Sequence, residues 1–237
     1  MKIVAIIPAR GDSKGIPLKN IVKVAGIPLI VYTINAAKKS KLIDRIIIST
    51  DNKKIAQISK LHGAEVPFIR PKKLSQDSSS TNVVISHTLQ FLATNQSYIP
   101  DIILILQPTS PLRTTKMIDQ SIDMLKKNNA TSIISVSKIK NHPFKSFWYD
   151  SKYLKPFKSD FEKKYHQRQL LPDLYYENGA IYTLWYKTFK KYKSIYGPKI
   201  KPMIIDDDSM TIDIDKKFDV FIAEKTLLNW AKFKQKL

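Results

Sequence analysis

The sequence predicts an α/β domain built on a mostly parallel sheet with helices on both faces. Short apolar runs alternate with longer amphipathic segments, and unusual polar loops follow the ends of the apolar runs. Strands that are apolar throughout are typical of parallel sheets, which are buried on both faces. With 237 residues and a 43% hydrophobic fraction, the chain is predicted to form one domain over residues 1–237.

The first half of the chain shows the clearest alternation. Strands are expected at residues 3–8, 44–50, 65–70 and 101–107, and helices at residues 28–40, 51–63, 81–95 and 114–129. Asp51 is the expected N-cap of the second helix, and Gly63 its C-terminal stop. In such a sheet the functional site lies beyond the carboxyl ends of the strands, where the unusual loops begin.

The second half interrupts this pattern. After a strand at 131–137, the segment 139–173 is rich in Lys, Phe, Tyr and Pro and has no clean periodicity, so we interpret it as an insertion. Its aromatic residues need a surface to bury against, either in their own domain or in a partner subunit. The core is expected to resume with strands at 179–185 and 202–206, and a helix at about 216–232 closes the chain.

Composition excludes several classes of protein. The chain contains no cysteine, which removes disulfides, thiolate catalysis and cysteine zinc sites and fits a cytoplasmic protein. No apolar run approaches the roughly 18 residues of a membrane span, so no membrane partner is expected. The net charge of +20 suits a polyanionic partner, but the lysines are spread along the chain without a nucleic-acid-binding motif.

The loop after the first strand, "IPARGDSKGIPLKN", is the first candidate site. Gly11 and Gly15 allow tight turns and a close approach of backbone N–H groups to a ligand. Arg10 offers a planar fork for phosphate oxygens, and Lys14 and Lys19 act as point charges. A basic, glycine-containing loop in this position is typical of phosphate binding, although a solvated loop in a lysine-rich chain is the alternative.

A second candidate, "QPTSPLR", follows the strongest predicted strand. Its two prolines stiffen the loop. Its hydrogen-bonding groups belong to Gln107, Thr109, Ser110 and Arg113. The alternative interpretation is a stiff connector in which Ser110 or Thr114 caps the next helix.

The third candidate is the carboxylate pair in "TIDIDKKFD". In an extended segment Asp213 and Asp215 point to the same face, where they repel each other unless a cation joins them. Mg²⁺ is commonly held by one or two carboxylates together with substrate phosphates. Alternatively, Asp215 is the N-cap of the last helix and Asp213 is simply exposed. A phosphate loop combined with a carboxylate pair is what Mg²⁺-dependent nucleotidyl transfer requires.

Four stretches resemble the acylneuraminate cytidylyltransferases, also called CMP-sialic acid synthetases. They are IPARGDSKGIPLKN, RPKKLSQDSSST, LQPTSPLR and NGAIY…IDID, in order along essentially the whole chain. The resemblance implies a Rossmann-like sheet of the nucleotide-diphospho-sugar transferase type. It also implies that the anomeric hydroxyl of a nine-carbon α-keto sugar acid attacks the α-phosphorus of CTP. The products are a CMP-sugar and pyrophosphate, and the metal is Mg²⁺, with Mn²⁺ as an alternative.

The same resemblance assigns the site residues. The nucleotide-binding positions are Arg10, Ser13, Lys14, Lys19, Asn20, Arg70 and Thr81. Lys19 and Arg10 would also be catalytic, Lys19 by stabilising the departing pyrophosphate. Asp213 and Asp215 match the metal-binding pair, and Asp213 could instead accept the proton of the attacking hydroxyl. The substrate-binding positions are Gln107, Arg168, Asn178 and Tyr182.

The resemblance also gives a meaning to the insertion. Residues 139–173 fall where the family carries a dimerisation arm that reaches the neighbouring subunit's sugar site, and Arg168 matches a basic arm residue. One departure concerns the sugar, because Tyr176 and Glu177 stand where many sialic acid enzymes have Arg-Pro. The exchange makes a related nonulosonic acid, such as legionaminic or pseudaminic acid, a candidate beside N-acetylneuraminate.

Two alternative functions follow from the same features. A cytidylyltransferase for the eight-carbon acid Kdo would share the I-P-A-R opening, but the K-G-I-P-L-K-N continuation speaks against it. A non-catalytic basic protein that binds nucleic acid or another polyanion would use the net charge alone. The two carboxylates speak against that alternative, because they would repel phosphate in the absence of a metal.

Overall fold

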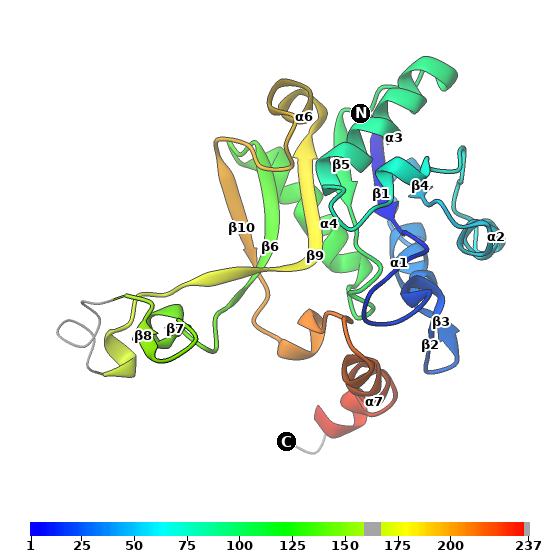
Figure 1. Cartoon of the computed structure of the whole chain (residues 1–237). Coiled ribbons are helices and arrows are strands. Elements are labelled where there is room, and N and C mark those ends of the chain that lie inside the picture. The colour runs from blue at the N-terminus through cyan, green and yellow to red at the C-terminus, as the bar shows by residue number, and fades with distance from the viewer. Residues whose placement is uncertain (159–166, 235–237) are drawn as a thin grey trace.

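A computed structural model describes residues 1–158 and 167–234, and it is built around one six-stranded sheet (Figure 1). The strand order is β10-β6-β9-β5-β1-β4. The strands are β1 (Ile3–Pro8), β4 (Arg45–Ser49), β5 (Ile102–Ile105), β6 (Ser132–Lys138), β9 (Tyr175–Trp185) and β10 (Ile200–Ile204). β9 pairs antiparallel with β5 and β6, and the other pairings are parallel. The predicted mostly parallel sheet is therefore confirmed.

Helices cover both faces of the sheet, as predicted. They are α1 (Leu29–Lys38), α2 (Lys53–Leu61), α3 (Thr81–Gln96), α4 (Thr115–Lys127), α6 (Tyr186–Tyr192) and α7 (Lys217–Lys234). Alternate residues of β1 enter different cores. Ile3, Ala5 and Ile7 pack with α1 and α4, whereas Val4 and Ile6 pack with α3 and α6. This two-sided burial explains why the strand is apolar at every position.

Three sequence expectations are corrected by the structure. Residues 65–70 form no strand: Glu65 makes one bridge with Ile47, and the chain then turns into the loop that carries Arg70. Asp51 is not the N-cap of α2, because the Asn52 side chain accepts the N–H groups of Lys54 and Ile55 instead. The short helix α6 was not predicted, because seven residues are too few to establish a helical period.

The remaining strands are short. β2 (Lys23–Val24) and β3 (Ile27–Pro28) form a hairpin before α1, and β7 (Phe147–Tyr149) pairs with β8 (Leu154–Pro156). The predicted final strands are shifted: β9 begins earlier, at Tyr175, and β10 ends at Ile204. Within the described residues, no helix is both long and apolar enough to cross a membrane.

The insertion between β6 and β9 projects from the sheet as an arm (Figure 1). Part of the predicted segment 139–173, residues 159–166, lies outside the described residues. The β7–β8 hairpin leaves its aromatic side chains in solvent, with Trp148 61% exposed and Tyr149 72% exposed. The structure therefore does not bury these aromatics on their own domain.

Candidate active site

A cavity of about 540 Å³ lies beyond the carboxyl ends of β1 and β5. It gathers residues from the first loop, the loop between α2 and α3, the loop after β5 and the segment before α7. The predicted site residues that line it are Arg10, Ser13, Lys14, Lys19, Asn20, Arg70, Thr81, Gln107 and Asp215. The sequence-predicted nucleotide site is thus brought together at one edge of the sheet, as expected for this class of fold.

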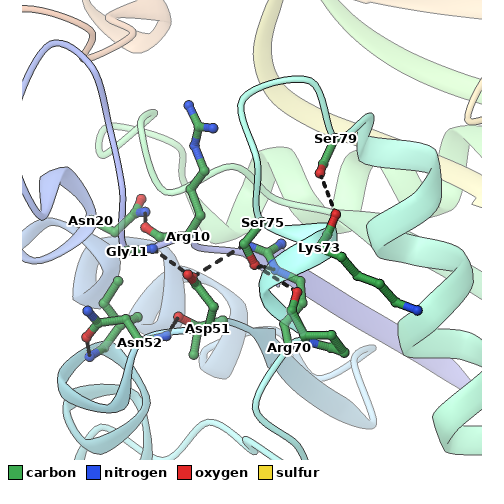
Figure 2. A network of polar contacts seen from close by, with 12 residues as sticks. Arg10, Gly11, Asn20, Asp51, Asn52, Arg70, Lys73, Ser75 and Ser79 are labelled. Carbon is green, nitrogen blue, oxygen red and sulfur yellow. Dashed lines mark hydrogen bonds and ion pairs between the residues drawn. The ribbon is translucent and has the colours of Figure 1, made fainter.

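The first loop is fixed by its own polar contacts (Figure 2). The buried Asn20 side chain donates from Nδ2 to the Arg10 carbonyl oxygen at 2.9 Å, which closes the loop on itself. The Gly11 N–H donates to Asp51 Oδ1 at 2.8 Å, which anchors the loop to the end of β4. These contacts hold the backbone of a loop whose Lys14 side chain remains exposed to solvent.

Asp51 also faces Arg70, and this role was missed in the sequence. Arg70 is buried, its Nε donates to Ser75 Oγ at 2.9 Å, and its Nη2 lies 3.9 Å from Asp51 Oδ1 (Figure 2). Burial lowers the pKa of Arg70, while the Asp51 carboxylate opposes that shift. The available signal was the position of Asp51, an acid directly after a strand at the site edge of the sheet.

The carboxylate segment lies directly against the first loop. A Cβ atom added to Gly15 would stand 2.4 Å from the Asp215 carbonyl oxygen, so only glycine permits this approach. Lys19 Nζ lies 2.8 Å from Asp215 Oδ1. The buried Ile214 anchors the segment, since its N–H donates to the Thr109 carbonyl oxygen at 2.9 Å. The three candidate loops therefore meet at one point.

Asp213 and Asp215 are arranged as a partly compensated acidic pair. Desolvation and the Asp215 carboxylate raise the pKa of Asp213, and the Thr109 hydroxyl and the Lys19 ammonium act in the opposite direction. Asp215 is not the side-chain cap of α7, because Asp219 Oδ2 accepts the N–H groups of Asp215 and Lys216. Among the described residues, no cluster of three or more acidic, His or Cys side chains could hold a metal by itself.

Arg113 connects the loop after β5 to β9 through hydrogen bonds. It is buried, and it donates to the carbonyl oxygens of Gln107 at 3.1 Å and Ala180 at 2.6 Å and to the Thr33 hydroxyl. Burial lowers the pKa of its guanidinium. Thr114 caps α4 by accepting the Met117 N–H, so the loop is a stiff connector as well as a wall of the cavity.

The predicted sugar-binding residues are more dispersed. Gly179 has a φ of 74°, and an added Cβ would stand 2.9 Å from Gln107 Oε1. The Tyr182 hydroxyl donates to Glu177 Oε2 at 3.1 Å, and the Tyr196 hydroxyl donates to the same oxygen at 2.9 Å. Burial and the Glu177 carboxylate raise the pKa of both phenols, that of Tyr196 to about 12. Both hydroxyls therefore remain donors at neutral pH.

Of the four predicted substrate-binding residues only Gln107 is among the described residues that line the cavity, and Tyr182, Asn178 and Arg168 are not. Asn178 is buried within the sheet, where its Oδ1 accepts from Ser135 Oγ at 2.6 Å and its Nδ2 donates to Ser137 Oγ at 3.0 Å. Arg168 begins the short 3-10 turn η4 (Arg168–Leu170) of the insertion, and its side chain lies outside the described part of the structure. All four substrate-binding assignments stay predictions.

The fold and the site are those of a nucleotidyltransferase, with basic side chains beside the carboxylate segment at the carboxyl edge of the sheet. The chain belongs to the cytidylyltransferase family, whose profile, described as "Cytidylyltransferase", matches residues 4–230. Within that family it is of the sialic acid CMP-synthetase type, as its sequence relatives indicate. The resemblance found in the sequence is thereby confirmed.

Two relatives are similar over nearly their full length. The chain is 36% identical over 231 residues to the CMP-N,N'-diacetyllegionaminic acid synthase of Legionella pneumophila, covering 96% of this chain and 97% of the relative. It is 31% identical over 225 residues to the pseudaminic acid cytidylyltransferase of Campylobacter jejuni, covering 94% and 95%.

A solved structure supports the fold. CMP:2-keto-3-deoxy-manno-octonic acid synthetase, complexed with CTP, matches with a TM-score of 0.70 and 15% identity over 100% of both chains. At that identity the match supports the architecture and not the substrate.

Proposed function

We propose that this enzyme transfers the CMP group of CTP to a nonulosonic, nine-carbon α-keto sugar acid and releases pyrophosphate. One observation carries the proposal: Lys19 of the basic loop contacts Asp215 of the carboxylate pair at the wall of the cavity. The full-length relatives act, by their names, on legionaminic and pseudaminic acids, which are sugar acids of this class. We propose that the reaction takes place in the cytoplasm.

The nucleotide would enter with its triphosphate against the first loop. Lys14 offers exposed positive charge and Arg10 partly exposed charge, whereas Lys19 is largely covered and lies beside Asp215. In phosphoryl transfer, most catalysis comes from positioning and from neutralising charge on the phosphates. Lys19 is therefore assigned to the departing pyrophosphate, and Arg10 to the phosphates that flank the reacting centre.

The remaining nucleotide residues shape the cavity around the cations. Arg70 is buried and held by Ser75 and Asp51, so its charge is preoriented toward the cavity that it lines. Ser13 and Thr81 line the same cavity and offer hydroxyl groups to the ribose or the phosphates. Asn20 would position the first loop for the nucleotide, because its side chain donates to the Arg10 carbonyl oxygen.

The acidic pair fits a divalent cation that takes its other ligands from phosphate. Two carboxylates and a nearby hydroxyl are hard oxygen donors, and the raised pKa of Asp213 reflects, in part, the repulsion that a cation would relieve. Asp213 and Asp215 would hold the ion, Mg²⁺ in our proposal and Mn²⁺ as the alternative. Bound there, it would neutralise phosphate charge and lower the pKa of the attacking hydroxyl.

The sugar acid would occupy the side of the site formed by β9. Gln107 lines the cavity next to Gly179, and Tyr182 and Glu177 follow along the same strand. We propose a homodimer in which the arm of each subunit covers the other's sugar site. The exposed Trp148 and Tyr149 support this arrangement, because such aromatics are enriched at protein interfaces.

The function is tested by measuring pyrophosphate release from CTP with a panel of nonulosonic acids, using Kdo as the matched control acid. We expect release with legionaminic or pseudaminic acid and loss of activity when EDTA removes the metal, with recovery on adding Mg²⁺. Turnover of Kdo alone would contradict the proposed substrate class. Release from CTP without any sugar acid would indicate a hydrolase instead.

A further inference from the structure

Asp77 forms ion pairs with two cationic side chains of the first loop. This residue lines the cavity in the loop between η2 (Lys72–Leu74) and α3. Its Oδ1 lies 2.5 Å from Arg10 Nη1, and its Oδ2 lies 3.1 Å from Lys14 Nζ. One carboxylate thus bridges the two side chains that the proposed function assigns to the phosphates of CTP.

The ion pairs of Asp77 are exposed enough for a phosphate group to replace the carboxylate. Asp77 is 45% exposed, and Arg10 and Lys14 also keep contact with solvent. Exposed ion pairs are weak, so a multiply charged phosphate can displace them. The more enclosed cations of the cavity are held differently, since Arg70 faces Asp51 and Lys19 faces Asp215. Of these four cationic side chains, Arg10 and Lys14 are thus the two that pair with Asp77.

The Asp77 carboxyl group is negatively charged at neutral pH. Its hydrogen bonds to Lys14 and Arg10 lower the pKa of the carboxyl group, so it is ionised at neutral pH. An ionised carboxylate and a phosphate oxygen cannot share the same two cations without strong repulsion. Binding of CTP must therefore separate Asp77 from at least one of its two partners.

We propose that Asp77 is an internal competitor of the phosphates, a role that rests on the proposed cytidyl transfer. Its carboxylate neutralises Arg10 and Lys14 in the free enzyme, yields them to the triphosphate, and retakes them as pyrophosphate departs. Asp77 thereby weakens the binding of both CTP and pyrophosphate. The benefit is faster product release, since a strongly basic pocket without a competing anion would retain pyrophosphate.

The test compares Asp77→Asn with Asp123→Asn, the same loss of charge on the exposed face of α4. Calorimetry on the full chain measures the affinities of Mg–CTP, inorganic pyrophosphate and uncharged cytidine. We expect Asp77→Asn to bind CTP and pyrophosphate about threefold to tenfold more tightly, the range of two exposed ion pairs. Cytidine affinity should not change, and Asp123→Asn should match the wild type for every ligand.

The sign of the effect separates this proposal from a structural role. If Asp77 only organised its loop or held a metal, Asp77→Asn would bind both phosphate ligands more weakly, and the proposal would be overturned. An equal gain for cytidine would also overturn it, because cytidine carries no phosphate. If the wild-type protein bound neither CTP nor pyrophosphate, the proposed function itself would fail, which is a distinct result.

Discussion

The proposed nucleotide end of the site is held by contacts between loops. The proposed sugar-acid end lies mainly along one strand, β9, which connects the arm to the sheet. At the nucleotide end, Gly11 is bonded to Asp51, Asn20 to Arg10, and Lys19 to Asp215. At the proposed sugar-acid end, Glu177 and Tyr182 lie along β9, which is buried from Asn178 to Leu184 but exposed from Tyr175 to Glu177.

This difference separates two tasks. CTP is the same whichever sugar acid the enzyme uses. The binding site for its triphosphate can therefore be held rigid by many internal contacts. The proposed sugar-acid end must discriminate between similar acids, and part of it lies on the exposed start of β9, where a substitution disturbs less of the buried core. The comparison predicts that changes at the nucleotide end alter turnover or CTP binding, and that changes on β9 alter sugar selectivity.

The largest effect is expected from Asp215→Ala. It removes one of the two carboxylates proposed to hold the metal and leaves the covered Lys19 without its acidic partner. We expect pyrophosphate release to fall roughly 100- to 1000-fold, the usual cost of losing a group that stabilises transition-state charge. The thermal midpoint should change little, because the Asp215 side chain is exposed. A fully active Asp215→Ala enzyme would refute the metal assignment.

A smaller loss is expected from Gly15→Ala. Its new methyl group would overlap the Asp215 carbonyl oxygen, which forces the phosphate loop and the carboxylate segment apart. Displacements of this size lower the turnover number by about tenfold to a hundredfold. Overpacking should also lower the free energy of unfolding by about 1–3 kcal/mol, measured by chemical denaturation.

Gly26→Ala is the matched control for that experiment. Gly26, unlike Gly15, has a positive φ, 81°, but an added Cβ would meet no atom within 4 Å. This variant should lose about 1 kcal/mol of stability through backbone strain and keep its turnover number. Equal losses of activity in both variants would show that the contact between Gly15 and Asp215 is not the cause.

Asp51→Asn should act on CTP binding rather than on the turnover number. The amide can still accept the Gly11 N–H, but the buried Arg70 loses the carboxylate that lies 3.9 Å away. We expect the KM for CTP to rise about threefold to tenfold. The neighbouring Asn52→Ala removes the cap of α2, so it should cost about 1 kcal/mol of stability without changing that KM.

The smallest effect is expected from Glu177→Gln at the sugar-acid end. The side chain keeps its shape, but the hydroxyls of Tyr182 and Tyr196 lose a charged acceptor. We expect the kcat/KM for the preferred sugar acid to fall about threefold while the KM for CTP is unchanged. Tyr196→Phe, which removes one donor and no charge, should change it less. A parallel loss of CTP affinity would contradict the separation of the two ends.

The sequence allowed the sheet and the charged loops to be predicted because both depend on local composition. The wholly apolar run of β1 predicted a strand buried on both faces, and Arg10, Lys19 and Asp215 are drawn together by the edge that parallel strands share. The error at Asp51 has a different cause. Asp51 and Asn52 are both good N-caps, and the choice between them depends on the distant Gly11 N–H.

Residues 65–70 and Asp77 show the same limit. Val66, Phe68 and Ile69 favour a strand by composition, but only Glu65 finds a partner in the sheet, and the loop instead buries Arg70 in the site. Nothing in the local sequence marks Asp77 as a partner of Arg10 and Lys14, because the contact joins two loops. Long-range polar contacts of this kind have no periodic signature.

The close approach of Gly15 to Asp215 also bears on how the enzyme becomes active during synthesis. The pair formed by Lys19 and Asp215 joins residues 196 positions apart. Contacts that close so long a stretch of chain form slowly compared with local structure. We therefore expect most of the sheet to form on the emerging chain before the carboxylates arrive, and the first loop to become ordered only with them, since its buried Ile16 shares a core cluster with Ile214. Catalytic competence would then be acquired in one late step, when the segment before α7 docks against Gly15.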